Sequence, residues 1–170
     1  AGEAFDKVSK ILGLGYPGGP VIDRLARQGN QRAVTFPRAY LEKDSLDFSF
    51  SGLKTAVLYH YRGQDLKNID TKTPSDQKIA DIAASFQAAV VEKTFLASRM
   101  YHVRGVLTGG GVAANSRLRQ RLKDKSKELS IPVYCPSVRL CTDNEAMVAG
   151  LAYKKYLEGD ILGLDLEAIP

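Results

Sequence analysis

The residues with the clearest chemical potential are three consecutive glycines, 109–111, placed where a strand is expected to lead into a helix. An apolar segment at 103–107 precedes them, and a basic helical pattern begins near Ser116. Glycines leave backbone N–H groups uncovered, and the following helix presents the positive end of its dipole. Such a turn suits a nucleotide or another anion, although the same glycines could serve only to turn the chain sharply.

Two familiar nucleotide motifs do not account for this turn. The spacing Gly109-x-Gly111-x-x-Ala114 fits the dinucleotide fingerprint, which also requires an acidic residue at the end of the next strand. The next predicted strand, at 131–135, runs instead into Pro136. A Walker loop is excluded because no Lys-Ser or Lys-Thr closes the glycines. The sequence therefore predicts a nucleotide turn of a third kind.

Carboxylates elsewhere could contribute to the same site. Asp6 lies on the first predicted helix, where it could accept hydrogen bonds from ribose hydroxyls or simply be a solvent-facing charge. Thr142, Asp143 and Asn144 precede the last predicted helix, so one of them is expected to be its N-cap. The Asp143 carboxylate could alternatively ligate a metal. The turn at 16–20 could close over a flat ligand or be an ordinary connection.

Periodicity predicts a largely helical first part. The expected elements are a helix over 3–12, a short helix over 21–27, a possible hairpin of strands 34–40 and 48–50, a helix from Ser51 or Gly52 to Tyr59, a loop over 63–75 and a long helix capped by Ser75 or Asp76.

From residue 103 onward the predicted order is strand, helix, strand, helix, the last helix covering 146–156. Leu118, Leu122 and Leu129 should form the buried stripe of the first of these helices. Its basic residues alternate every second position between 117 and 127 and so spread around the helix. They indicate a solvated surface, with an RNA-binding patch as the alternative.

Composition sets broad limits. With 170 residues, 44% of them hydrophobic, the chain can bury one core, as one domain or as a two-lobed fragment. A net charge of +5 permits contact with nucleic acid without requiring it. Cys135 and Cys141, with no signal peptide or long apolar segment, predict free thiols, a cytoplasmic location and no membrane partner. His60 and His102 lie too far apart for a His-x-x-x-His metal pair. The chain opens without methionine within a helical pattern, so we expect a piece of a longer protein.

Six segments, in order along the chain, resemble the C-terminal half of the tRNA adenosine threonylcarbamoyltransferase (TsaD) family, formerly labelled glycoprotease. They are residues 1–7, 16–20, 48–55, 80–87, 110–115 and 140–144. The resemblance implies an α/β fold of the actin/Hsp70/sugar-kinase (ASKHA) type with an additional helical portion. Residues 1–75 would border the nucleotide cleft, and residues 76–170 would form an actin-like lobe.

The resemblance also implies roles for individual residues. It makes Asp143 a metal ligand and assigns the nucleotide site to Asp6, Gly19, Gly110, Gly111 and Asn115. The metal would be one divalent ion, iron or zinc, whose other ligands include a histidine pair that this chain lacks. We therefore expect weak metal binding and no catalysis by the isolated chain.

The implied reaction transfers a threonylcarbamoyl group from threonylcarbamoyl-AMP to the adenosine beside the anticodon of tRNA. Implied partners are tRNA, an adenine nucleotide or threonylcarbamoyl-AMP, an actin-like paralogue and a small ATPase. Two alternatives stay open at this stage. One is a nucleotide-binding or assembly module of actin-like fold, and the other is the metallopeptidase of the older family label.

Overall fold

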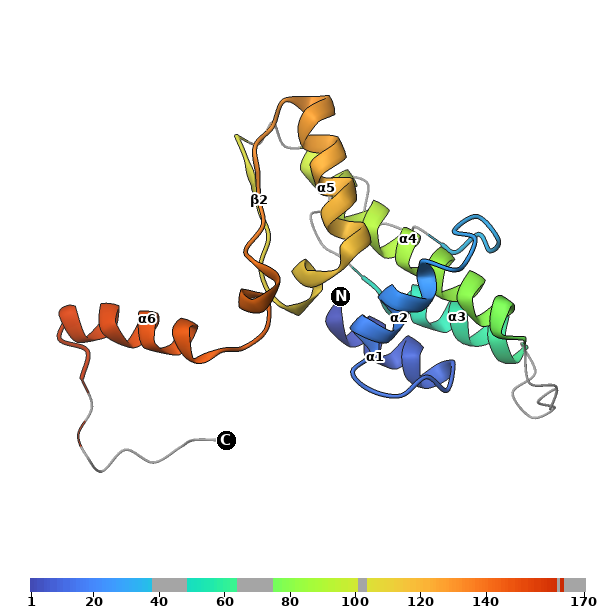
Figure 1. Ribbon diagram of the computed structural model, residues 1–170, viewed down its shortest axis with the longest axis horizontal. Coiled ribbons are helices and arrows are strands. Elements are labelled where there is room, and N and C mark those ends of the chain that lie inside the picture. Colours follow the sequence, from blue (N-terminus) through green and yellow to red (C-terminus); the bar gives the residue numbers. More distant parts are fainter. Residues whose placement is uncertain (38–48, 64–74, 101–103, 162, 164–170) are drawn as a thin grey trace.

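The computed structural model describes residues 1–37, 49–63, 75–100, 104–161 and 163. Its helices are α1 (Gly2–Ile11), α2 (Gly18–Ala26), α3 (Ser51–Arg62), α4 (Asp76–Met100), α5 (Ser116–Leu129) and α6 (Glu145–Leu157). Its strands are β1 (Val106–Leu107) and β2 (Val133–Tyr134), and two short 3-10 turns are η1 (Gly111–Ala114) and η2 (Val138–Leu140). Figure 1 shows α1 to α4 gathered into one body, with α5 at its edge and α6 apart from it.

The core of this body forms where α1, α2 and α3 pack against α4. Phe86 of α4 is fully buried and meets the ring of Phe5 edge-on, with 5.2 Å between the ring centroids. Ile79, Ile82 and Phe86 recur at helical spacing, so one face of α4 turns toward the other helices. Ser75 caps α4 because its hydroxyl accepts a hydrogen bond from the Lys78 backbone N–H at 3.3 Å. The long helix predicted to begin at Ser75 or Asp76 is thus confirmed.

Two glycines let α2 approach its neighbours closely. A Cβ atom at Gly18 would lie 2.4 Å from the carbonyl oxygen of Phe5 in α1. At Gly29, just after α2, a Cβ would lie 2.0 Å from the Ala80 carbonyl oxygen in α4. The backbones of α1 and α4 therefore lie so close to Gly18 and Gly29 that neither position has room for a side chain.

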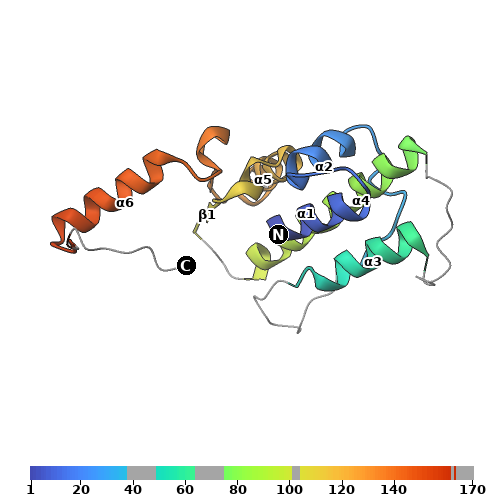
Figure 2. The same cartoon turned by 90° about the horizontal axis from the view of Figure 1, so that it is seen from below.

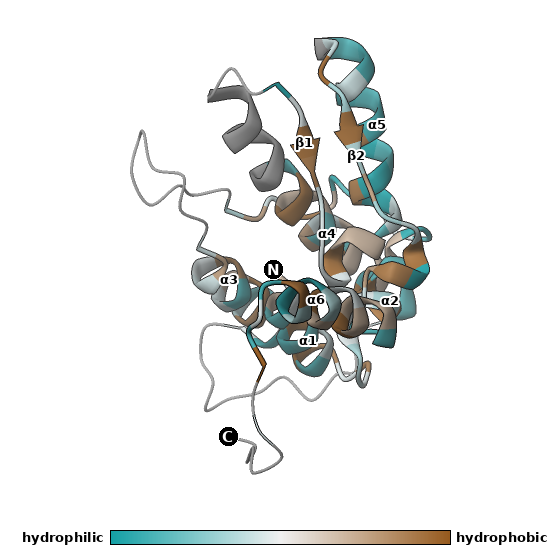
Figure 3. Cartoon of the chain, turned by 90° about the vertical axis from the view of Figure 1, so that its left-hand side faces the viewer, coloured by the Kyte–Doolittle hydropathy of each residue, from teal (hydrophilic) through white to brown (hydrophobic). Residues whose placement is uncertain are grey.

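The two strands form a small parallel sheet, with Val106 opposite Val133 and Leu107 opposite Tyr134. Helix α5 covers one face of the sheet, where Leu118 and Leu122 are buried. The hydropathy colouring of Figure 3 shows the two strands as apolar beside the largely hydrophilic α5. The predicted strand–helix–strand–helix order is confirmed, although the side chain of Leu129 lies outside the described residues.

Helix α6 projects away from the rest of the molecule, as Figures 1 and 2 show from two directions. None of its residues is buried. Its exposed apolar side chains include Val148, Leu151 and Tyr153, which are 70%, 59% and 65% accessible. No described helix is long and apolar enough to cross a membrane.

Two local expectations were wrong. Residues 34–37 and 49–50 are not strands, and the remainder of the expected hairpin, 38–48, lies outside the described residues. Phe36 is instead buried in the helical core, where its ring meets that of His60 at 5.9 Å between centroids. The rigid turn expected at 16–20 is partly helix, because α2 begins at Gly18. Proline is tolerated in a first helical turn, where a backbone N–H has no intrahelical partner, so Pro20 does not delay the start.

Candidate functional site

Asp6 connects α1 to the beginning of α2. Its Oδ1 atom accepts a hydrogen bond from the Gly18 backbone N–H at 2.7 Å, and the residue is half-buried. Pro17, the N-cap residue of α2, provides no side-chain cap, so the Asp6 carboxylate satisfies one of the free N–H groups there. The adjacent Gly19 has nothing within 4 Å of where a Cβ would stand. Asp6 and Gly19 therefore border an open surface at a helix N-terminus.

The glycine turn is equally open. Gly110 has a φ of +74°, a conformation that favours glycine, and Gly111 begins η1. Neither residue has an atom within 4 Å of its ideal Cβ position. Val112 follows and lies 3.8 Å from the ideal Cβ position of Gly2 at the start of α1. The turn thus sits beside α1 with its backbone uncovered.

Asn115 ends this turn and is 8% exposed. Its Oδ1 atom accepts hydrogen bonds from the Leu118 backbone N–H at 2.9 Å and from Gln87 Nε2 at 3.2 Å. The first of these contacts makes Asn115 the N-cap of α5. The second ties the start of α5 to α4.

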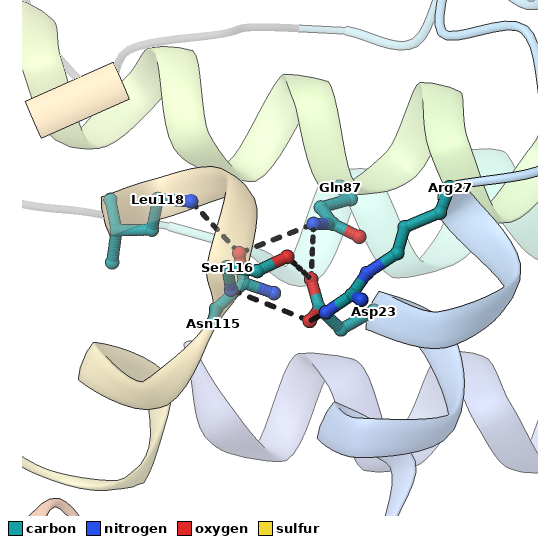
Figure 4. A network of polar contacts seen from close by, with 6 residues as sticks. All are labelled: Asp23, Arg27, Gln87, Asn115, Ser116 and Leu118. Atoms are coloured by element: carbon teal, nitrogen blue, oxygen red, sulfur yellow. Dashed lines mark hydrogen bonds and ion pairs between the residues drawn. The ribbon is translucent and has the colours of Figure 1, made fainter. Parts of the chain in front are cut away.

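Asp23 links α2 to Gln87 of α4 and to Ser116 at the start of α5 (Figure 4). Its Oδ1 atom accepts from Gln87 Nε2 at 2.8 Å and from the Ser116 hydroxyl at 2.9 Å. Its Oδ2 atom accepts from Arg27 at 3.2 Å and from the Ser116 backbone N–H at 3.4 Å. The side chain is 13% exposed, so a charged carboxylate lies nearly buried at the N-terminus of α5, where the helix dipole favours it.

Asp23 and Gln87 were missed by sequence reasoning. Asp23 lies four residues after Gly19, which places the two on the same face of a helix. That spacing could have identified Asp23, provided that α2 had been predicted to begin at Gly18. Gln87 carried no comparable signal, because an amide within an apolar helix face has no motif of its own.

A cavity of about 590 Å³ adjoins this network. It opens between the end of α2, the middle of α4 and the start of α5. The polar residues that line it include Arg27, Asn30, Gln31, Gln87, Ser116 and Arg117. Gln87 and Ser116 belong both to the cavity wall and to the Asp23 network, so cavity and network are continuous.

Two lysines lie beside Glu3 in the first turn of α1. Lys7 and Lys54 lie 2.6 and 3.4 Å from the Glu3 carboxylate. The hydrogen bond from Lys7, with the charges of both lysines, lowers the pKa of Glu3, and the same contact raises the pKa of Lys7. Glu3 and Lys7 are both highly exposed, so the ion pair between them contributes little to stability.

Asp143 lies apart from these residues. It is exposed, in the segment between η2 and α6. Asn144 is the N-cap of α6, since its Oδ1 atom accepts from the Met147 backbone N–H at 3.1 Å. Among the described residues, no three histidine, cysteine or acidic side chains are close enough to hold a metal ion. The donor set that this part of the chain offers, a single carboxylate, does not fit a complete metal site.

A glycine turn between a parallel strand and a helix, with polar groups gathered at the helix N-terminus, is the arrangement of nucleotide-binding α/β proteins. The sequence identifies the family. The model of the tRNA N6-adenosine threonylcarbamoyltransferase (TsaD) family matches residues 1–150, and the chain belongs to this family.

Curated proteins named tRNA N6-adenosine threonylcarbamoyltransferase are similar to the whole of this chain. Over the whole of this chain, the protein from Moorella thermoacetica is 52% identical, that from Kosmotoga olearia 49% and that from Clostridioides difficile 45%. The chain spans about half the length of these relatives, 49%, 49% and 50% respectively. The family resemblance expected from the six ordered segments is confirmed.

Proposed function

We propose that this chain is the C-terminal part of an enzyme that transfers a threonylcarbamoyl group from threonylcarbamoyl-AMP to the adenosine next to the anticodon of tRNA. Its share of the work is to hold the adenylate portion of the intermediate. What supports this proposal is the junction at which α2 contacts two of the predicted segments. Asp6 of α1 accepts from the Gly18 N–H at its start, and Asp23, one turn beyond Gly19, accepts from Ser116, the residue after the Asn115 cap of α5.

Each group at this junction has a role that its chemistry suits. The Asp6 and Asp23 carboxylates accept hydrogen bonds, and ribose hydroxyls donate them. The open backbone at Gly110 and Gly111 can approach the phosphate without side chains in the way. Asn115 is a positioning residue, because its side chain fixes the first turn of α5.

The reaction is an attack by the exocyclic amine of adenosine on a mixed anhydride of a carbamate and AMP. A bond forms between the amine nitrogen and the carbamoyl carbon, and the bond from that carbon to the bridging phosphate oxygen breaks. AMP leaves with the electron pair of the broken bond, and the nitrogen releases one proton to solvent. Groups that hold the adenylate in place keep the scissile bond oriented toward the amine, which converts a bimolecular encounter into a positioned one. The residues of this chain supply this orientation.

Four further assignments belong to the same proposal. The fold is a lobe of the ASKHA type, with 1–75 bordering the cleft and 76–170 as the actin-like portion. The parallel pair β1–β2 covered by α5 supports this α/β assignment. Asp143 contributes one ligand to a divalent iron or zinc site whose remaining ligands come from elsewhere in the whole protein. The partners are tRNA, an actin-like paralogue and a small ATPase.

Nucleotide binding can be tested by thermal unfolding of the 170-residue chain with increasing AMP. Binding at about 100 times the dissociation constant stabilises a protein by about 2.7 kcal/mol, so the unfolding temperature should rise. In Asn115→Ala the rise should be much smaller. The matched control is Asn144→Ala, which also removes an N-cap but lies before α6, away from the junction. An AMP response equally reduced in both variants would contradict the assigned site.

A binding module without enzymatic activity is the second candidate, since the junction by itself explains binding alone. Joining the chain to the N-terminal half of a relative, and supplying threonylcarbamoyl-AMP and tRNA, distinguishes the two. Modified adenosine from the joined protein, reduced by Asp23→Asn, supports the transferase. Intact AMP binding without any product supports the module.

A further inference from the structure

We propose that Arg119 of α5 is a positioning residue that holds the glycine turn and the segment after β2 as one unit, so that a nucleotide bound at the turn also fixes the segment that leads to Asp143. The inference rests on the proposed nucleotide site. It is carried by a single guanidinium group, which contacts three separate segments of the chain, 6, 17 and 22 residues away from Arg119.

The donors of Arg119 are divided between the two sides. Nε donates to the backbone carbonyl of Ala113 in η1 at 2.6 Å. Nη2 donates to the backbone carbonyl of Pro136 at 2.5 Å and to Cys141 Sγ at 3.1 Å. Because the guanidinium is planar and rigid, the angle between these donors is fixed, and the three acceptors keep set positions relative to one another.

On the first side, the contact reaches the glycine turn. The Ala113 backbone N–H donates to the Gly110 carbonyl oxygen at 2.9 Å, and Ala113 is buried. Both polar backbone groups of Ala113 are therefore occupied, the N–H by Gly110 and the carbonyl by Arg119. Arg119 thus fixes the orientation of η1, which begins at the open backbone of Gly111.

On the second side, the contacts lie before and after η2. Pro136 precedes this turn and Cys141 follows it. None of the η2 residues is buried, so apolar packing contributes little to the position of the turn. Cys141 is buried, and its thiol also donates to the Ser137 carbonyl oxygen at 3.4 Å. Arg119 and Cys141 therefore hold η2 beside α5, and Asp143 follows two residues after Cys141.

The geometry of Arg119 matters here more than its charge. Among the residues that the structure describes, no carboxylate pairs with this half-buried guanidinium, and its three acceptors are neutral groups. Lysine keeps the positive charge but carries all its donors on one nitrogen at the end of a flexible stem. Arg119→Lys therefore separates the geometric role from the electrostatic one.

A ligand that restrains η1 also restrains the segment at 136–141, because both are hydrogen-bonded to the same rigid group. A bound adenylate and the residues around Asp143 then keep a constant separation. Reactions between positioned groups are sensitive to displacements of about 1 Å, so this connection would favour the proposed transfer.

Hydrogen exchange of the 170-residue chain, measured by mass spectrometry with and without AMP, tests the connection. AMP at about 100 times its dissociation constant slows exchange by up to about a hundredfold at amides whose opening releases the nucleotide. In the unmodified chain we expect slower exchange at both 109–115 and 137–141. In Arg119→Ala and Arg119→Lys, with AMP raised to the same saturation, only 109–115 should respond.

The ratio of the exchange rates with and without AMP is the informative quantity. A purely structural role of Arg119 would speed exchange at 137–141 by the same factor in both conditions and leave this ratio unchanged. A response at 109–115 shows that each variant is folded and binds AMP. Arg121→Ala is the matched control, because Arg121 belongs to the same helix and makes no polar contact with another described residue. It should leave both responses as they are.

The outcomes separate this inference from the proposed function. AMP protection at 109–115 alone in the unmodified chain would overturn the connection and leave the nucleotide site standing. Protection at 137–141 that persists in both Arg119 variants would overturn the role of Arg119. Protection of neither segment in the unmodified chain would overturn both proposals.

Discussion

Helices α4 and α6 contain similar runs of residues and have opposite surroundings. Residues 82–91 of α4 carry no charged side chain, and neither do residues 146–153 of α6. In α4 that run is entirely buried against α1, α2, α3 and α5. In α6 every residue of the run is exposed, and the helix projects from the body (Figure 2).

The difference shows what stabilises each helix. Most helical stability in proteins comes from tertiary packing of the apolar face, and isolated helices shorter than about 12–15 residues are marginal in water. Helix α4 gains that packing, through contacts such as Phe86 on Phe5. Helix α6, with 13 residues, depends on its own hydrogen bonds and on the Asn144 cap. The uncharged run of α4 therefore stabilises the fold by packing, whereas the similar run of α6 does not.

The largest expected effect tests this contrast directly. Phe86→Ala should lower the free energy of unfolding in urea by about 3–5 kcal/mol, because it removes a fully buried ring and leaves a cavity. Leu151→Ala in α6 should change it by less than about 0.5 kcal/mol, because Leu151 is 59% exposed. If Phe86→Ala does not fold, Phe86→Leu gives a smaller loss on the same scale. Comparable losses at Phe86 and Leu151 would mean that α6 is packed in solution.

Glycine substitutions should give effects of opposite sign in the two regions. Gly29→Ala should destabilise the body by about 1–3 kcal/mol, because its Cβ would stand 2.0 Å from the Ala80 carbonyl oxygen and force α2 away from α4. Gly150 lies inside α6 with nothing within 4 Å of its ideal Cβ position. Alanine there should stabilise the helix by about 0.5–1 kcal/mol. Urea unfolding measures the first change, and helical circular dichroism measures the second. A loss of helix in Gly150→Ala would contradict the exposed setting of α6.

The smallest expected effect is a pH dependence of stability that arises from His60 in the body formed by α1 to α4. Burial and the nearby charge of Lys78 lower the pKa of His60 below its usual value of 6.5. The folded state therefore resists protonation more than the unfolded state does, and the contribution of His60 to stability is full above pH 6.5. It declines as the pH falls below 6.5 toward the lowered pKa.

The unfolding temperature measured between pH 7.5 and 5 checks this expectation. In His60→Gln the unfolding temperature should fall less over this pH range than in the unmodified chain, by a difference within about 2 °C. Added salt should reduce the part that comes from Lys78. An identical decline in His60→Gln would assign the pH dependence to other groups.

Much of the fold could be predicted because periodic apolar residues and turn residues are local signals. The helix at 3–12 and the strand–helix order after 103 were recognised in this way. The bounds of α1 and the start of α5 agree closely with the prediction, whereas β1 covers only Val106–Leu107. The expected hairpin failed where local signals conflict with packing. Residues 34–37 have strand-forming side chains, yet Phe36 gains more from burial beside α3 than from pairing with a strand.

The candidate site was also only partly predictable from the sequence. The glycine turn and Asn115 were visible as a motif, because a glycine run before a helix has a fixed geometric consequence. Gln87 had no sequence signal, and Asp23 had only its spacing from Gly19, because their roles arise from contacts between residues 64 and 93 positions apart. The metal role of Asp143 stays a prediction, since a metal site requires several donors brought together in space.

By itself, the sequence determined the family and the order of the elements, because both are carried by residues close together along the chain. Only the tertiary structure decided that α2 packs on α1 and α4 through two glycines, that Gln87 of α4 links Asp23 to Asn115, and that no residue of α6 is buried. Burial and hydrogen-bond satisfaction depend on which distant segments meet, and no local pattern of residues encodes those meetings.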